Sequence, residues 1–344
     1  MTSKNHQGNT KVKTRSRHLL LVGLALSILI LIICLITSLT KGDAEIPLNT
    51  VYKSFTAFDG STEQLIIRTL RLPRTLIAML VGASLAVAGS IMQGLTRNPL
   101  ASPGILGVNA GAALAVVSAS LIFTSSSFNI YATFGFLGGT VAAVTVYWLG
   151  SLGKGGLHPV KLAIAGAAIT ALLSSLTTAI LIFNQEDLEK IRFWLAGSVA
   201  GKDLNLFWQV FPYLLVGLVM AFLLARQVTL LTLGEDVATG LGVQTTWVKL
   251  GATICVVLLA GCSVSIAGAI GFIGLVVPHI ARLLVGVDYR WIIPYSAVLG
   301  SILLLLADIA ARLVLKPIEI PVGIMTALIG GPFFIYLALS KVKR

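Results

Sequence analysis

The chain has 344 residues, of which 56% are hydrophobic and only 11% are charged, and its mean hydropathy is +0.95. Soluble globular domains do not have this balance, whereas membrane proteins with several spanning helices do. The formal net charge is +12, but the basic residues lie largely at the chain ends and between apolar runs. Such a distribution is typical of topology signals and headgroup contact, and it argues against a nucleic-acid partner.

Ten stretches are long and apolar enough to span a bilayer, since a spanning helix needs about 20 mostly apolar residues. The predicted spans are Leu19–Leu39, Leu76–Leu95, Gly104–Phe123, Phe128–Leu149, Leu162–Phe183, Leu206–Ala225, Trp247–Ile266, Ala269–Val287 (broken by Gly271, Gly274 and Pro278), Trp291–Val314 and Val322–Leu339. Basic residues between 11 and 17 place the N-terminus in the cytoplasm, and an even count returns the basic residues 341–344 to the same side. The sequence therefore predicts an all-α polytopic membrane protein, with residues 40–66 and 184–205 outside.

The rest of the domain organisation is simple. Residues 1–17 are polar and basic, and we expect a disordered cytoplasmic tail followed by one transmembrane domain over 18–344. The apolar run after the tail is too long for a typical signal-peptide core and is interpreted as a retained helix. Cys34, Cys255 and Cys262 lie inside apolar runs and form no C-x-x-C pair, so they neither predict a disulfide nor indicate a redox compartment.

Two groups of charges stand out near the predicted outer face. Arg68, Arg71 and Arg74 would lie outside by the ten-span count, where basic residues are less expected. Because the two chain ends agree with each other, we interpret these arginines as having a task on that face. Asp308 and Arg312 are four residues apart with the acid first, which favours an ion pair within the ninth span. A charged pair at membrane depth is either structural or functional.

The chain also repeats itself weakly. Residues Leu80–Pro99 align without a gap on Leu259–Pro278, and in the ten-span count these segments run in opposite directions. The matched positions are Gly82 with Gly261, Ser84 with Ser263, Ala88-Gly89 with Ala267-Gly268, Ile91 with Ile270 and Pro99 with Pro278. Transporters commonly build a central pathway between two such inverted halves, with glycine- and proline-broken helices at matching positions. We therefore predict a weak inverted repeat.

A short polar stretch, Leu230–Gln244, interrupts the apolar sequence and falls on the cytoplasmic side. Glu235 and Asp236 follow a glycine, as first-turn carboxylates of a short helix do, and Gly240 and Gly242 are placed to end it. From this stretch alone, an ordinary connecting loop is the simpler alternative.

Signals for catalysis or for a bound cofactor are missing from the sequence. Residues 196–203 resemble a phosphate-binding loop but lack its first glycine and the Ser/Thr that would hold magnesium. His279 follows Pro278 without a second ligand at metal-binding spacing, and a packed or capping histidine is its simpler interpretation. Asn98 and Pro99 belong to a predicted turn. We thus expect no enzyme activity, no cofactor and no metal, so that active transport would need a partner or an ion gradient.

Five motifs in order resemble one family, the iron-siderophore, haem and vitamin B12 permeases of bacterial ATP-binding-cassette (ABC) importers. The motifs are Arg71-Leu72-Pro73-Arg74, Gly82–Gln93 with Asn98-Pro99-Leu100-Ala101, Leu233–Val243, Ala267–His279 and Glu319–Gly323. The resemblance covers nearly everything after about residue 45. It implies ten helices in each of two permease subunits, identical or homologous, with the pathway at their interface in the bacterial cytoplasmic (inner) membrane.

The resemblance also implies roles for particular residues. A loop at about 230–246 would contact a cytoplasmic ABC ATPase dimer, through Leu233, Gly234, Glu235, Asp236, Val237, Ala238, Gly240, Leu241 and Gly242. An extracytoplasmic substrate-binding protein would dock on Arg71, Arg74 and Arg312. The pathway and gate candidates are Gln93, Asn98, Pro99, His158, Pro159, Val160, Pro278 and His279. The small hydroxyl residues that the vitamin B12 permease has at the inner gate do not occur here at 158–160.

The leading hypothesis is thus a permease subunit for a ferric siderophore or similar iron chelate. Vitamin B12 or haem import within the same family is the alternative. A secondary transporter driven by an ion gradient is the rival from another class, and it would need intramembrane carboxylates, for which Asp308 is the one clear candidate inside a predicted span. A membrane scaffold without transport does not account for broken helices at repeat-related positions.

Overall fold

The computed structural model describes residues 17–42, 44–123, 128–153, 159–183, 185–316 and 318–342, and no β-strand occurs within these ranges. Its helices are α1 (Arg17–Thr40), α2 (Leu48–Thr56), α3 (Thr62–Ile66), the π-helical turn η1 (Ile67–Arg71), α4 (Leu72–Thr96), the 3-10 turn η2 (Pro103–Leu106), α5 (Val108–Ile122), α6 (Phe128–Ser151), α7 (Pro159–Phe183), α8 (Gln185–Ala196), α9 (Leu204–Thr232), α10 (Glu235–Gly240), α11 (Thr245–Ala267), α12 (Ile273–Val285), α13 (Tyr289–Leu313) and α14 (Val322–Val342). Within the described residues, seven helices are long and apolar enough to cross a membrane, and three shorter apolar helices accompany them. The all-helical multi-pass fold is confirmed.

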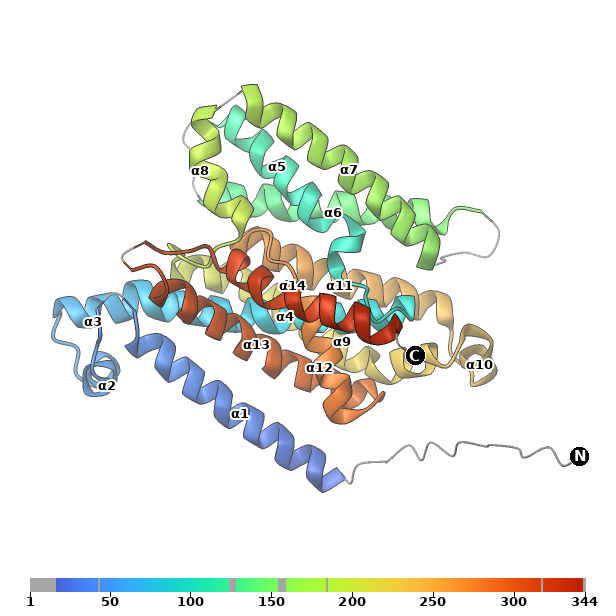
Figure 1. Cartoon of the computed structure of the whole chain (residues 1–344), viewed down its shortest axis with the longest axis horizontal. Helices are drawn as coiled ribbons and strands as arrows, with labels where there is room; N and C mark the ends of the chain where they lie inside the picture. Colours follow the sequence, from blue (N-terminus) through green and yellow to red (C-terminus); the bar gives the residue numbers. More distant parts are fainter. Residues whose placement is uncertain are drawn as a thin grey trace, which may run out of the picture.

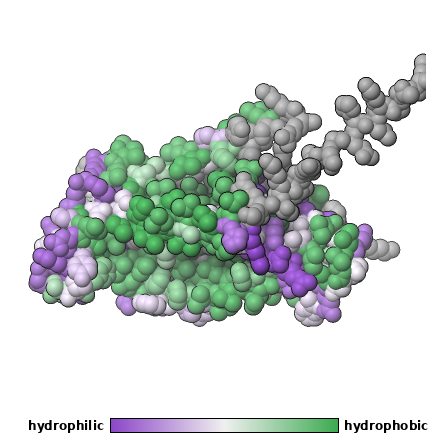
Figure 2. Space-filling view, turned by 90° about the horizontal axis from the view of Figure 1, so that it is seen from below, coloured by the Kyte–Doolittle hydropathy of each residue, from purple (hydrophilic) through white to green (hydrophobic). Residues whose placement is uncertain are grey.

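The long helices run roughly along the longest axis of the molecule (Figure 1), so the molecule has two ends. Helix α10 lies at one of them, where α1 begins and α14 ends, and we call it the α10 end. Helices α2 and α3 lie at the opposite end, which we call the arginine end. Figure 2 shows a broad apolar belt between polar ends on one face, as a protein surrounded by lipid requires.

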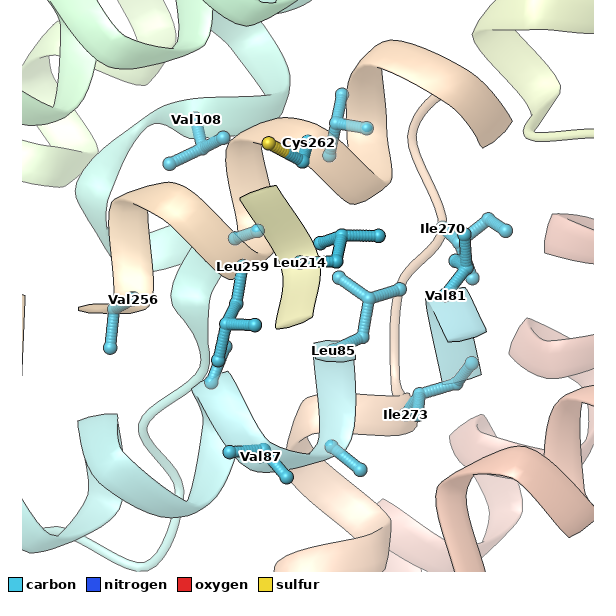
Figure 3. Close-up of a cluster of buried hydrophobic side chains, with 14 of the residues drawn as sticks. Val81, Leu85, Val87, Val108, Leu214, Val256, Leu259, Cys262, Ile270 and Ile273 are labelled. Carbon is cyan, nitrogen blue, oxygen red and sulfur yellow. The ribbon is translucent and has the colours of Figure 1, made fainter. Parts of the chain in front are cut away.

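Helix α4 is the central element because its small residues let other helices approach closely. It contacts α9, α11, α12 and α13, and 21 of its 25 residues are buried. A Cβ on Gly82 would overlap the carbonyl oxygen of Gly300 in α13, and one on Gly89 would overlap the backbone of Gly274 in α12. The small residues of α4 thus serve packing, since backbone meets backbone there. Branched side chains such as Val81, Leu85 and Leu259 fill the core beside it (Figure 3).

The order of helices agrees with the predicted repeat. Helices α4, α5 and α6 contain 25, 15 and 24 residues, and α11, α12 and α13 contain 23, 13 and 25. The packing is exchanged in the same way, because α4 packs on α13 and α11 packs on α6. Each half therefore lays its first long helix against the third helix of the other half, as interlocked repeats would.

Several predicted boundaries differ from the structure. The sixth predicted span ends at Ala225, but α9 continues to Thr232, so the polar stretch begins while the chain is still helical. The third predicted span is divided by Gly107, which has φ +71° between η2 and α5. In the eighth, the break precedes the helix at 268–272, where Phe272 has φ +66°, and Pro278 lies inside α12.

Two segments expected to be outer connections contain helices. Residues 40–66 hold α2 and α3, and 184–205 hold α8. These helices have too few apolar residues to resemble spans. The face of α2 that packs on the bundle is narrow, with Val51 and Ser54 buried. These helices were not predicted, because long apolar runs were the signal for helices and α2, α3 and α8 have none.

Candidate functional site

The polar stretch at the α10 end forms a short helix between two glycine turns. Gly234 has φ +118° and Gly242 has φ +83°, conformations that side chains disfavour and that glycine adopts without a steric penalty. Between them, α10 begins at Glu235 and ends at Gly240, so Glu235 and Asp236 are first-turn residues, as predicted. Ala238 of this helix is fully buried, and it packs against Leu231 of α9 and Val248 of α11.

Helix α10 exposes apolar side chains outside the apolar belt. Leu233, Val237 and Leu241 are 59%, 49% and 60% exposed. Val237 and Leu241, four residues apart, lie on one side of the α10 turn, because helical side chains recur at i+4. Leu233 is exposed at the end of α9, directly before the Gly234 turn. Trp247, at the start of α11, is also exposed. We call these four residues the apolar stripe. An exposed apolar group of this kind at a polar end is typical of a protein interface.

Glu235 is tied to two other helices of the same chain. Its Oε1 lies 2.6 Å from Nζ of Lys249 in α11 and 3.9 Å from Nη2 of Arg97. Arg97 caps α4 in a left-handed conformation with φ +50°, directly after the central helix ends. Neither partner was predicted from the sequence. A lysine only two residues inside the predicted seventh span was a detectable signal, because charges there are unusual.

Gln93 and Pro278, both predicted pathway candidates, meet at the contact between α4 and α12. Proline has no N–H, so the carbonyl of Gly274 loses its ordinary helical donor. Nε2 of Gln93 lies 3.4 Å from this oxygen and 3.2 Å from the carbonyl oxygen of Leu275, and donates to both. Its own oxygen accepts from Arg282. Gln93 thus supplies the hydrogen bond that proline removes from α12, and it joins that helix to α4.

The remaining pathway candidates are spread around the molecule. Asn98 accepts from the backbone N–H of Leu100 at 2.9 Å, which forms the predicted turn after α4. His279 stacks edge to face with Phe333 of α14, with ring centroids 6.1 Å apart. Pro159 and Val160 begin α7, where Val160 is exposed. His158 lies outside the described residues. A gating role for any of these stays a prediction.

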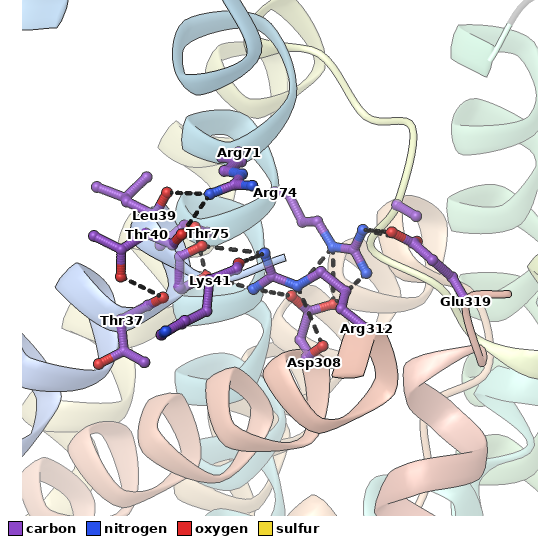
Figure 4. A network of polar contacts seen from close by, with 12 residues as sticks. Thr37, Leu39, Thr40, Lys41, Arg71, Arg74, Thr75, Asp308, Arg312 and Glu319 are labelled. Carbon is purple, nitrogen blue, oxygen red and sulfur yellow. Dashed lines mark hydrogen bonds and ion pairs between the residues drawn. The ribbon is translucent and has the colours of Figure 1, made fainter. Parts of the chain in front are cut away.

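At the arginine end, Arg74 joins α4 to both acidic residues near it (Figure 4). Its Nε lies 2.9 Å from Asp308 Oδ1 and its Nη1 lies 2.8 Å from Glu319 Oε2. Asp308 is fully buried and also pairs with Arg312 at 3.1 Å, which confirms the predicted intrahelical pair. The contact with Glu319 was not predicted, because no local signal in the sequence places Glu319 beside Arg74.

Arg71 and Arg312 close the end of α1. Nη1 of Arg71 donates to the carbonyl oxygens of Leu39 and Thr40, and Nη1 of Arg312 donates to that of Ser38 at 3.1 Å. The last carbonyls of a helix have no partner within it, and a cation there also complements the helix dipole. Both arginines are nearly buried by these contacts. Docking of another protein on them stays a prediction.

A cavity of about 330 Å³ lies beside these arginines, and its walls bring distant segments together. It is lined by Gly42, Ala44, Ile66, Leu70, Arg71, Arg74, Ala200, Gly201, Lys202, Arg312 and Glu319. Lys202 lies in the turn before α9, and burial lowers its pKa to about 7. The three arginines outnumber Glu319 and the Asp308 carboxylate behind the lining, and Lys202 adds a partial positive charge, so the cavity is electropositive and suited to an acidic ligand.

Among the described residues, no three His, Cys, Asp or Glu side chains gather where they could hold a metal ion. The two ends instead offer an apolar stripe and a basic cavity, joined by α4. A multi-pass bundle with paired repeats and such ends has the construction of a membrane permease.

Residues 29–340 match the model of the FecCD transport family, and the chain belongs to that family. It is 52% identical over 306 residues to the iron(3+)-hydroxamate import system permease protein FhuB of Bacillus subtilis, covering 88% of this chain and 78% of FhuB. It is 43% identical to the Fe(3+)-citrate import system permease protein YfmD of the same organism, covering 96% and 97%. A solved ABC transporter assigned to the metal-chelate type, in an inward-facing conformation, superposes with a TM-score of 0.81 at 31% identity, covering 93% of this chain and 99% of that one.

Proposed function

We propose that this chain is the permease subunit of an ABC importer that carries a ferric siderophore or similar iron chelate across the bacterial cytoplasmic (inner) membrane. Membership of the FecCD transport family is the observation that carries the proposal. Two relatives named for ferric hydroxamate and ferric citrate import support iron chelates as the cargo class. The chain itself is the transport subunit, and a separate subunit hydrolyses ATP.

Three protein partners follow from this proposal. A cytoplasmic ABC ATPase dimer docks on α10, for which the apolar stripe provides a surface outside the lipid belt. A second permease subunit, identical or homologous, completes the pathway. An extracytoplasmic binding protein delivers the cargo at the arginine end, where acidic side chains would meet the basic cavity. Arginine suits such contacts because its guanidinium pairs with carboxylates in a fixed, bidentate geometry.

The mechanism uses the rigidity of the two repeats. Closure of the ATPase moves α10, and the interlocked halves then rock against each other and open the pathway to the cytoplasm. This kind of alternating access moves packed bundles about a fixed cargo site. The short α10, flanked by glycine turns, is built to move as a unit against the bundle. The gate candidates Gln93, Asn98, Pro99, His158, Pro159, Val160, Pro278 and His279 line the pathway in this proposal.

The test is uptake by proteoliposomes that contain the permease with its ATPase. Ferric hydroxamate, presented by the binding protein, should accumulate when ATP is available to the ATPase, and an ionophore should leave the rate unchanged. Uptake that collapses with the ionophore and ignores ATP would identify an ion-driven transporter instead. Haem and vitamin B12, offered with the same components, should not accumulate. If either does and ferric hydroxamate does not, the cargo assignment is wrong.

A further inference from the structure

The side chain of Glu235 faces the bundle and not the free side of α10. With 3.6 residues per turn, Glu235 lies on roughly the opposite side of the helix from Val237 and Leu241. Its carboxylate contacts Lys249 of α11 and approaches Arg97 at the end of α4. A residue in this position is poorly placed to bind an outside protein while its partners hold it.

The three charged groups connect elements that are otherwise weakly joined. Helix α10 has six residues, and one fully buried side chain, Ala238, holds it on α9 and α11. Glycine turns at Gly234 and Gly242 separate it from α9 and α11 along the chain. Movement of α10 would therefore be absorbed by these turns unless a side-chain contact carries it further.

We propose that Glu235 transmits the movement of α10 to α4 and α11 through its contacts with Lys249 and Arg97, while the apolar stripe binds the ATPase. This inference rests on the proposed function. Helix α4 is a suitable receiver because it is buried along most of its length and reaches the far end of the molecule at Arg74. The contact with Lys249 is the stronger of the two, because it is shorter and because only 11% of that side chain is exposed.

The test compares transport per ATP hydrolysed in complexes of the permease with its ATPase. Glu235→Gln and Lys249→Gln should lower this ratio at least about fivefold, the lower bound of a typical coupling between sites. Arg97→Gln should lower it less, because its charge lies further from Glu235. The exchanged pair E235K/K249E should recover a large part of the loss. Asp288→Asn is the matched control, since the ion pair of Asp288 is with Arg290 of α13 at the same end, and asparagine caps a helix as well as aspartate.

The inference is overturned if E235Q transports as well per ATP as D288N does. It is also overturned if E235Q fails to co-purify with the ATPase and the exchanged pair restores nothing, because Glu235 is then a docking residue. A second measurement needs no transport, so it stands even if the proposed function is wrong. In the isolated permease, E235Q and K249Q should speed amide hydrogen exchange in residues 235–241, and D288N should not. Unchanged exchange in all three variants contradicts the connection.

Discussion

The two ends of the bundle differ in how deeply their charged groups are buried. At the arginine end, Arg74 and Arg312 enclose a fully buried carboxylate, and Arg71 and Arg312 close the last turn of α1. At the α10 end, the Glu235 carboxylate is 40% exposed in its contacts with Lys249 and Arg97, and the most exposed feature is apolar. Since buried charges are costly to separate and exposed apolar groups gain from being covered, the first end is suited to hold the fold and the second to bind a partner.

At the arginine end, charged groups that are paired within the chain can also be distinguished from those that a docked protein could contact. A guanidinium that satisfies three backbone carbonyls, as Arg71 does, has little capacity left for an outside carboxylate. Glu319 is 35% exposed, whereas Lys202 in the same cavity is as buried as Arg71, so a docked protein would reach Glu319 first. Substitutions that test stability and partner binding separately can break or sharpen this comparison.

The largest effect is expected at Asp308. Replacing it with alanine leaves Arg74 and Arg312 without their shared buried carboxylate, and breaking such a pair costs about 3–5 kcal/mol. Thermal unfolding in detergent should therefore show a strong loss of stability in D308A. Glu319→Gln removes a half-exposed partner of the same Arg74 and should lower stability much less. Equal melting of the two variants would show that the arginine end does not hold the fold.

At the α10 end, a substitution should change partner binding strongly and stability little. Leu241→Asp changes an exposed side chain, so the free energy of unfolding should move by less than about 0.5 kcal/mol. Association with the ATPase should weaken about 30-fold or more, as when an interface hot spot worth 2 kcal/mol is lost. Val287→Asp is the control, because Val287 is equally apolar and exposed at this end but belongs to the turn before α13. Co-purification that is lost in both variants would point to a general effect of charge.

The next prediction concerns the contact of α4 with α12, where Gln93 donates to the carbonyls of Gly274 and Leu275. Gln93→Leu leaves the carbonyl of Gly274 without a donor in a buried site, which costs about 1–3 kcal/mol. Pro278→Ala should rescue part of this loss, because alanine restores an N–H for the carbonyl of Gly274. A double-mutant cycle on unfolding measures the coupling. Additive losses would mean that the amide does not compensate for the proline.

These contacts also show where sequence reasoning ends. Hydrophobic length predicted the spans, and glycine and carboxylate positions predicted α10, because both signals are local. The i, i+4 rule likewise predicted the pair of Asp308 with Arg312. Arg74 and Glu319 are 245 residues apart in the chain, and nothing local indicates that the packing of α4 brings them together. The same holds for Gln93 with Pro278, whose chemistry is visible in the sequence but whose meeting depends on the glycine contact between helices.

The last prediction is a pH dependence of stability from a single residue, Lys202. Burial lowers the pKa of this amine to about 7, whereas in the unfolded chain it keeps its ordinary value of 10.5. Between these values the unfolded chain binds more protons, so this residue makes stability rise with pH from about 7 upward, by at most about 1.4 kcal/mol per unit. Lys202→Met should flatten that part of the profile in thermal unfolding from pH 7 to 9. Because the variant removes only this titration, the difference between the two profiles isolates it from other groups. A parallel pair of profiles would mean that the amine remains protonated inside the cavity, and the arginine end would then carry one more permanent positive charge for an acidic partner.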